Sequence, residues 1–156
     1  TQGVSSAASD VYKRQEHLFH LTLAGDVTLS RLDIGVPYMD KSNIARRGHR
    51  QDRRCRGDTW FIPYETVQGR AQKFHHPGTF PVMLPQMCIR LHGKRAPVVL
   101  DPFMGTGTTL VAAVREGGQG IGIDLDTIYV NVARQRVREA MRIEADGATG
   151  AGDQEI

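Results

Sequence analysis

The sequence is poor in cysteine and has no long apolar run. Its 156 residues include two cysteines, Cys55 and Cys88, which lie too far apart to form the close pairs of redox motifs and zinc knuckles. This usage is typical of a reducing compartment and argues against a disulfide framework. No apolar stretch approaches the length of a membrane span, and no charged-then-apolar leader opens the chain. We therefore expect an intracellular chain without a membrane partner.

Signatures of metal and phosphate binding are missing as well. His17 and His20 have no third ligand nearby, so we expect surface or half-buried histidines and no metal site. The sequence contains neither GxGxxG nor Gly-Lys-Ser/Thr, and these absences disfavour a dinucleotide and a nucleoside triphosphate as ligands. The net charge of +3 is compatible with a polyanionic partner but decides nothing alone.

The stretch VVLDPFMGTGTTLVAAV, which begins at Val98, predicts a strand, a glycine turn and a helix. Its first three residues are apolar, as in a strand that is buried on both faces of a parallel sheet. Gly105 and Gly107 allow the chain to turn sharply and let a ligand approach the backbone. A helix follows, which Thr108 or Thr109 is suited to cap, and its first-turn amides point back at the turn. This pattern indicates a cofactor-binding unit.

A second predicted strand, from Gly120 to Ile123, is followed by an acidic residue, Asp124. A carboxylate about 20 residues after the first glycine is suited to hold the hydroxyls of a ribose. Any strand-helix-strand unit can also carry an acid at this place, so spacing alone leaves both interpretations open.

The segment from Lys41 to Arg56 is the most charged part of the chain, with seven basic residues opposed only by Asp52. Such a density of arginine suits contacts with DNA phosphates, and arginine also reads guanine edges in the major groove. A solvated loop explains the same composition equally well.

Weaker patterns predict the remaining elements. Loose alternation around a Gly-Asp turn favours a hairpin from His17 to Leu32, and Trp60 begins a predicted aromatic strand. Apolar residues at helical spacing predict one helix from Phe80 to Leu91 and a last helix from Thr127 to Ile143.

The sequence DPFMGTGTT, followed by GIDLDTIYVNVARQRV, resembles the cofactor half of the DNA amino-methyltransferases whose catalytic motif precedes the cofactor motif. In that family FxGxG is the S-adenosylmethionine loop, and Phe103, Gly105 and Gly107 match it. HPGTFP, just upstream, resembles the family element HPxxFP, whose turn covers the methionine end of the cofactor. The resemblance extends from Arg31 to Arg142. It implies a partial Rossmann-like class I methyltransferase fold of the α/β class, with parallel strands, flanking helices and an irregular or β recognition segment in front.

The resemblance also implies the binding residues. S-adenosylmethionine carries no phosphate, so loop amides and a helix terminus need only hold its methionine carboxylate, while Asp124 holds the ribose. The implied cofactor-binding residues are His76, Thr79, Phe80, Asp101, Phe103, Gly105, Thr106, Gly107, Thr108 and Asp124. In this family order the target-recognition region lies just before the cofactor half, which favours contacts with double-stranded DNA for Arg46, Arg47, Arg50, Arg53 and Arg54.

The implied activity is transfer of a methyl group from S-adenosylmethionine to adenine N6 or cytosine N4 in DNA, as in restriction-modification systems. Its setting is the cytoplasm of a bacterial, archaeal or phage-infected cell. However, the family's catalytic motif, Asp/Asn/Ser-Pro-Pro followed by an aromatic residue, is absent from the sequence. GVPY at Tyr38 and FIPY at Tyr64 lack the double proline. We therefore expect no catalytic residue in this chain and no activity of the chain alone.

Several questions stay open at this point. The missing motif is the usual clue to adenine or cytosine, and the sequence gives neither a recognition site, nor a cognate restriction enzyme, nor an oligomeric state. A non-catalytic DNA-binding module and an RNA or small-molecule methyltransferase are the alternatives to the implied activity. A nicotinamide oxidoreductase would need a third, phosphate-binding glycine.

The chain divides into four expected parts. Residues 1–15 form a non-native or disordered leader, because SSAASDVYKRQ resembles translated sequencing-adaptor read-through. Residues 16–72 are the basic segment that resembles a target-recognition region, and residues 73–143 are the half-domain that binds S-adenosylmethionine. Residues 144–156, which are small, polar and rich in glycine, form a flexible tail.

Overall fold

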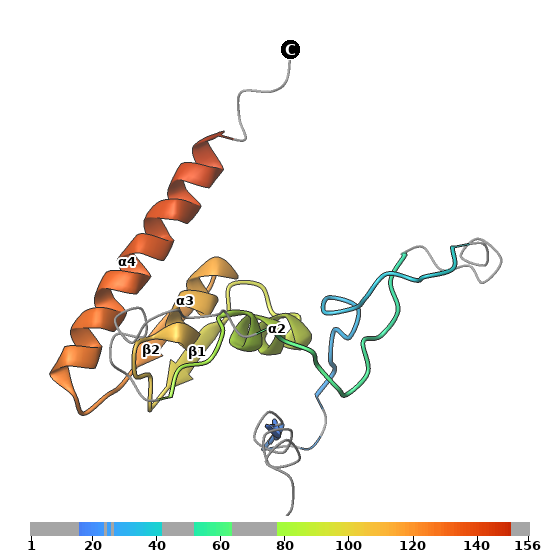
Figure 1. The fold of residues 1–156 in the computed structure, drawn as a ribbon, viewed down its shortest axis with the longest axis horizontal. Helices are drawn as coiled ribbons and strands as arrows, with labels where there is room; N and C mark the ends of the chain where they lie inside the picture. Colours follow the sequence, from blue (N-terminus) through green and yellow to red (C-terminus); the bar gives the residue numbers. More distant parts are fainter. Residues whose placement is uncertain (1–15, 24, 26, 42–51, 64–77, 151–156) are drawn as a thin grey trace, which may run out of the picture.

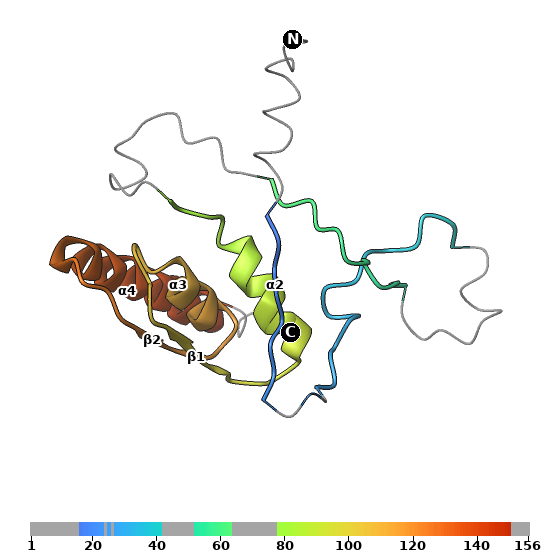
Figure 2. The same cartoon turned by 90° about the horizontal axis from the view of Figure 1, so that it is seen from below.

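The regular structure lies in the second half of the chain. The computed structural model describes residues 16–23, 25, 27–41, 52–63 and 78–150, the last four of these by their backbone only. The elements in chain order are α2 (Met83–His92), β1 (Val98–Asp101), α3 (Thr108–Arg115), β2 (Gln119–Gly122) and α4 (Thr127–Gly150). In Figures 1 and 2 residues 27–41 and 52–63 lie on the side of α2 that is away from α4, whereas residues 16–23 run alongside α2.

Strands β1 and β2 pair in parallel, which confirms the predicted pairing. The register joins Val98 to Gln119 and Leu100 to Ile121. One further bond continues the ladder, because the amide of Ile123 donates to the carbonyl of Asp101 at 2.9 Å. The chain therefore leaves both strands at the same edge of the sheet, where the glycine turn also lies.

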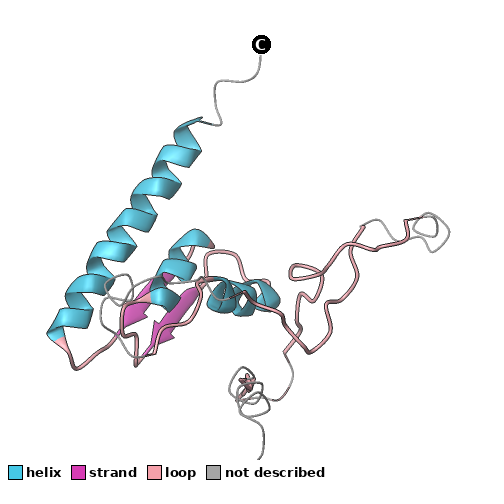
Figure 3. Cartoon of the chain, in the orientation of Figure 1, coloured by secondary structure: helices cyan, strands magenta, loops and turns pink. Residues whose placement is uncertain are grey.

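Helix α3 covers one face of this sheet, as Figure 3 shows. Glycines on that face let the helix approach closely: a Cβ on Gly120 would lie 2.8 Å from the Leu110 side chain, and Gly122 faces Leu110 and Met104. Side chains alternate along a strand, so Val98, Leu100 and Ile121 point to the opposite face.

The opposite face is uncovered in the described part of the chain. Val98 is 67% exposed and Ile121 54%, and Leu100 and Ile123 are exposed too. The prediction that the first strand is buried on both faces is therefore wrong for these residues. A buried second face needs a second layer of helices, and the described helices all lie on the α3 side or beyond it.

The small core forms where α2 and α4 pack against α3. Met104, Leu110 and Ala133 form its buried centre, flanked by Val130 and Val137 of α4. On the other side of α3, the Arg90 guanidinium of α2 contacts both carboxylate oxygens of Glu116 at 3.0 and 2.9 Å. The Gln86 amide donates to the same carboxylate at 2.8 Å.

Two helix boundaries differ from the predicted ones. Helix α2 begins at Met83 and not at Phe80, because Pro85 lacks an amide hydrogen and is tolerated only in a first helical turn. Helix α4 begins at Thr127 as predicted but continues to Gly150, past Ile143. Its added turns include Glu144 and Ala145, which favour helix. Residues 144–150 of the expected flexible tail are therefore helical, and 151–156 lie outside the described residues.

The predicted strands before residue 64 are wrong where the structure describes them. Residues 16–23 and 27–32 contain no strand, and neither do residues 58–63. A hairpin needs a packing surface for its apolar face, and Phe19, Leu21 and Phe61 are exposed. An isolated bridge joins Val36 to Arg54, with bonds of 3.0 and 2.8 Å.

Contacts at the end of α2 join this irregular region to the folded half, and one of them is the edge-to-face packing of the His20 and His92 rings, whose centroids lie 5.0 Å apart. The amide of Ser30 donates to the carbonyl of Leu91 at 2.7 Å, at the end of α2. Residues 1–15, 42–51 and 64–77 lie outside the described residues, so the predicted leader and most of the basic segment go without a structural description. In the described part of the chain, no helix combines the length and apolar character that a bilayer crossing requires.

Candidate cofactor site at the glycine turn

The glycine turn joins β1 to α3 at the carboxyl edge of the sheet. Gly105 has φ 50° and Gly107 has φ 76°, a left-handed conformation that glycine adopts without the steric cost of a Cβ. Gly107 is the N-cap of α3, and no side chain caps the helix. The prediction that Thr108 or Thr109 caps it is wrong, because glycine occupies the cap and the Thr108 hydroxyl has another partner.

Most amides of the turn are bonded to the chain itself. The bonds run from Phe103 N to Asp101 Oδ1 at 3.0 Å, from Met104 N to Ile123 O at 3.0 Å, from Gly105 N to Asp124 Oδ2 at 2.8 Å, and from Gly107 N to Met104 O at 2.8 Å. A ligand carboxylate at this turn would instead meet the first-turn amides of α3, which have no partner within the helix.

Asp124 lies directly after β2 and reaches across to the turn. One carboxylate oxygen accepts the Gly105 amide, and the other accepts the amide of Asp126 at 2.9 Å. A carboxylate has about four acceptor positions, so this half-buried side chain can accept further bonds from ribose hydroxyls. The Asp126 carboxylate accepts the amide of Ile128 at 2.8 Å, at the beginning of α4.

Arg136 of α4 contacts the turn, although it was not among the predicted site residues. Its Nη1 atom donates to the Thr106 carbonyl at 2.7 Å, to the Thr106 hydroxyl at 2.8 Å and to the Thr108 hydroxyl at 3.1 Å. The sequence signal for this contact is the spacing of Ala133 and Arg136, which stand three residues apart and therefore share a helix face. In the structure Ala133 packs against Gly107, and this packing brings Arg136 to the turn as well.

The other predicted cofactor residues fall into three groups. Thr106 and Thr108 are 3% and 5% exposed, and their hydroxyls accept bonds from α4. Phe103 is 88% exposed beside the half-buried Asp101. Thr79 and Phe80 lie just before α2; Thr79 is half-buried and Phe80 is partly exposed. His76 is outside the described residues.

The structure describes only the two ends of the basic segment, Lys41 and residues 52–56. Arg53 and Arg54 are exposed, while Arg46, Arg47 and Arg50 lie outside the described residues. Arg56 is held in place, since its Nε donates to the carbonyl of Ile34 at 2.9 Å. The Lys41 ammonium pairs with the Asp52 carboxylate at 2.6 Å. The Nη1 atom of Arg53 donates to the carbonyl of Leu32 at 3.5 Å, and this guanidinium stays exposed.

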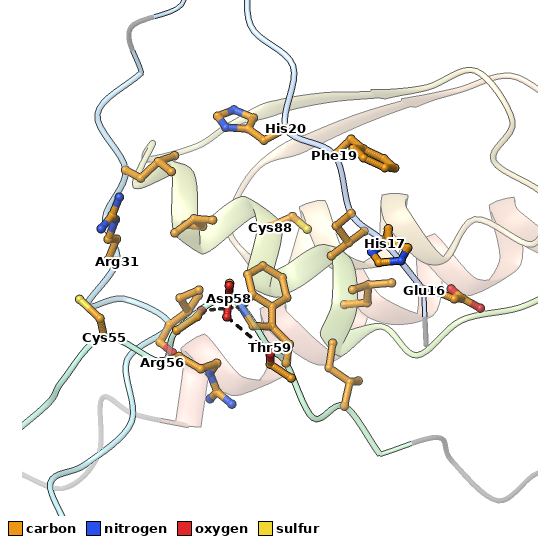
Figure 4. Close-up of a pocket in the computed structure, with 18 of the residues that line it drawn as sticks. Glu16, His17, Phe19, His20, Arg31, Cys55, Arg56, Asp58, Thr59 and Cys88 are labelled. Carbon is orange, nitrogen blue, oxygen red and sulfur yellow. Dashed lines mark hydrogen bonds between the residues drawn. The ribbon is translucent and has the colours of Figure 1, made fainter. Parts of the chain in front are cut away.

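A separate cavity of about 1010 Å³ lies between α2 and the irregular segments at 16–20 and 55–62. Figure 4 shows Phe19, His17 and Cys88 on its walls, and no predicted cofactor residue lines it. Burial raises the pKa of the Cys88 thiol, which disfavours the reactive thiolate. In the part of the chain that is described, no three metal-binding side chains come together.

Comparison with known proteins decides the family. Residues 1–135 match the family model of the N6 and N4 DNA methylases. The chain belongs to this DNA methylase family. Enzymes of the family use S-adenosylmethionine to methylate DNA. The predicted fold class and the predicted cofactor of the family, S-adenosylmethionine, are thereby confirmed, and the alternative activities are not favoured.

Several curated DNA methylases resemble the chain. It is 37% identical to the type II methyltransferase M.BglI of Bacillus subtilis over 78% of its own length and 30% of that protein. It is 29% identical to M1.MboII of Moraxella bovis over 84% of its length and 56% of that protein. The chain thus spans between about a third and a little over half of these relatives.

Two solved structures are similar as well. TTHA0409 of Thermus thermophilus, complexed with S-adenosyl-L-methionine, is 31% identical with a TM-score of 0.38, covering 57% of this chain and 42% of that one. The M1.HpyAVI–SAM complex is 28% identical with a TM-score of 0.40, covering 53% of this chain and 40% of that one.

Proposed function

We propose that this chain is the cofactor-binding part of a DNA methyltransferase that methylates adenine N6 or cytosine N4. The observation that carries the proposal is the bond between the Gly105 amide and the Asp124 carboxylate. It brings the FxGxG turn and the acid after β2 together at the edge where two parallel strands end, which is where sheets of this class bind ligands.

The described residues bind the cofactor and take no part in the methyl transfer itself. Asp124 accepts the ribose hydroxyls, and the exposed ring of Phe103 offers an apolar face to the adenine base. The first-turn amides of α3 hold the methionine carboxylate. When bound, S-adenosylmethionine would supply an electrophilic sulfonium methyl group to the amine nitrogen of a flipped base, with release of S-adenosylhomocysteine and a proton. No enzyme nucleophile is needed, so neither cysteine has to act.

The proposed partner is double-stranded DNA. Arg53 and Arg54 are exposed, and the sequence places Arg46, Arg47 and Arg50 in the same basic segment. Guanidinium groups at this density bind phosphates and give salt-dependent affinity. A protein that acts on DNA in this way works in the cytoplasm of a bacterial, archaeal or phage-infected cell.

Calorimetric titration of the chain with S-adenosylmethionine tests the proposal, with NAD and ATP as control ligands. We expect binding of S-adenosylmethionine alone. A folded chain that binds none of the three contradicts the proposed function.

A methyl-transfer assay with labelled cofactor then tests the catalytic part. We expect no incorporation into DNA, because the double-proline motif that orients the amine is absent, and alignment supplies on the order of 7 to 11 kcal/mol of the barrier. Robust incorporation would contradict this expectation and make Tyr38 or Tyr64 a candidate to hold the base.

A further inference from the structure

Arg136 binds the glycine turn from behind, through three oxygens. Its Nη1 atom lies 2.7 Å from the Thr106 carbonyl oxygen, 2.8 Å from the Thr106 hydroxyl and 3.1 Å from the Thr108 hydroxyl. Both threonines are buried, so water cannot readily replace the guanidinium as their partner. Bonds from a charged donor are about twice as strong as bonds between neutral groups.

These bonds fix one peptide group from both sides. The carbonyl of the Thr106–Gly107 peptide accepts from Arg136, and its amide donates to the Met104 carbonyl at 2.8 Å. Gly107 is also the N-cap of α3, and its own carbonyl accepts the amide of Val111 at 3.0 Å. The direction in which the first turn of α3 points therefore depends on where Arg136 holds this peptide.

Packing keeps Arg136 at this place. Ala133, one helical turn earlier on α4, lies against the same turn, and a Cβ on Gly107 would be 2.7 Å from the Ala133 Cβ. Helix α4 thus contacts the turn both by close packing and by charge. Arg134 and Arg138 on the same helix are exposed, so they serve as comparisons.

We propose that Arg136 is a positioning residue for the cofactor. Its guanidinium holds the glycine turn in the one conformation that directs the amides of α3 at the methionine carboxylate of S-adenosylmethionine. This inference rests on the proposed function, because it assigns Arg136 to the same site. The arginine itself does not touch the cofactor.

Calorimetry on the full chain measures the effect. Arg136→Met should raise the Kd for S-adenosylmethionine by about tenfold or more, the factor that corresponds to one lost charge-assisted bond. Arg136→Lys should recover part of the affinity, because an ammonium group still donates. Arg134→Met, which removes an exposed charge from α4, should leave the Kd unchanged.

A second control separates positioning from stability. Ala140 is buried in α4 one turn beyond Arg136, so Ala140→Gly weakens the helix without contacting the turn. It should lower the Tm and leave the Kd unchanged. The proposal is wrong if Arg136→Met binds like the parent chain, or if Ala140→Gly weakens binding as much as Arg136→Met does at a similar loss of Tm.

Hydrogen exchange gives a readout that needs no cofactor. Amides of residues 105–110 should exchange faster in Arg136→Met than in the parent chain, and Arg134→Met should not change them. Unchanged exchange in Arg136→Met overturns the positioning role. Failure of the parent chain to bind S-adenosylmethionine overturns the proposed function, so the two failures are distinguishable.

Discussion

The backbone amide of Gly105 and the carboxylate of Asp124 meet at 2.8 Å, although 19 positions separate them in the chain. This bond joins the turn after β1 to the residue after β2. The same carboxylate also receives the amide of Asp126. Asp124 thus holds the glycine turn in place, and the same carboxylate is the proposed ligand of the ribose hydroxyls.

Replacing Asp124 should therefore have two effects. Asp124→Ala removes two proposed bonds to the ribose, roughly 1.5 to 3 kcal/mol each in binding. It also leaves the Gly105 amide without its acceptor, which should lower the Tm. Calorimetry and thermal unfolding measure the two effects separately.

Asp126→Asn is the matched control for this change, because the Asp126 carboxylate bonds to the first turn of α4 and not to the glycine turn. It should leave the affinity for S-adenosylmethionine unchanged. Normal affinity in Asp124→Ala would mean that Asp124 only shapes the turn.

Gly107→Ala should destabilise the chain by about 2 to 4 kcal/mol, from the left-handed backbone and from overpacking together. Gly107 has φ 76°, and the new Cβ would lie 2.7 Å from the Ala133 Cβ. Chemical denaturation measures the loss of unfolding free energy.

Gly117→Ala measures the cost of the left-handed backbone without the cost of overpacking. Gly117 has φ 69°, but a Cβ added there would have nothing within 4 Å, so we expect a loss of about 1 kcal/mol. Equal losses at the two glycines would contradict the packing argument between the turn and α4.

The ion pair between Arg90 and Glu116 should couple α2 to α3. Glu116 is 14% exposed and receives a two-point contact, and hydrogen bonding to it raises the pKa of the Arg90 guanidinium. A double-mutant cycle with Arg90→Met and Glu116→Gln should give a coupling of about 1 kcal/mol, since Arg90 is half exposed and solvent weakens the pair.

The pair of Arg142 and Glu139 on α4 is the comparison for this cycle. Both side chains are largely exposed and join by a single bond at 3.2 Å, so the coupling should be about 0.5 kcal/mol or less. A coupling at Arg90 no larger than this would show that packing and the Gln86 bond hold α2 without a measurable contribution from the ion pair.

The sequence predicted the elements that local signals determine. The apolar run before Asp101, the turn glycines and the helical spacing after Thr127 each predict an element that the structure contains, although α4 continues past Ile143 to Gly150. The two strand ends of a strand-helix-strand unit meet at one edge, so the sequence placed Asp124 near the same ligand as the turn, but it did not predict the direct bond from the Gly105 amide.

Features that depend on distant contacts were not predictable in this way. Arg136 reaches the turn only because α4 packs on α3 with Ala133 against Gly107. The loose alternation from His17 to Leu32 suggested a hairpin, but alternation produces strands only where a surface covers one face. In place of such a surface, the end of α2 supplies a hydrogen bond to Ser30 and the edge-to-face contact of His92 with His20.

Removing exposed arginines should reduce the salt dependence of DNA binding. In Arg53→Gln and Arg54→Gln, loss of a phosphate contact lowers the magnitude of the salt slope by about 1, whereas loss of a base contact relaxes sequence preference at a cost of about 1 to 3 kcal/mol. Arg138→Gln, an exposed change on α4, is the control. Unchanged duplex binding by the Arg53 and Arg54 variants at every salt concentration would identify a solvated loop.

The two cysteines should differ in alkylation. Cys55 is exposed, whereas Cys88 is half-buried in α2 and burial raises the pKa of its thiol. Iodoacetamide should modify Cys55 first, and modification of Cys88 should become appreciable only at more alkaline pH or after unfolding. Peptide mass spectrometry over a pH series measures both rates, and faster labelling of Cys88 at neutral pH would contradict its burial.

Helix α3 contacts each of the other four regular elements, whereas those four contact one another only through β1 and β2 in the described part of the chain. The 8 residues of this helix therefore connect nearly every interface of the folded half. Loss of α3 separates the sheet, α2 and α4 at once, so these elements cannot unfold independently. The region from α2 to the first turns of α4 should melt as one cooperative unit, with the glycine turn protected to the same extent as the helix that follows it.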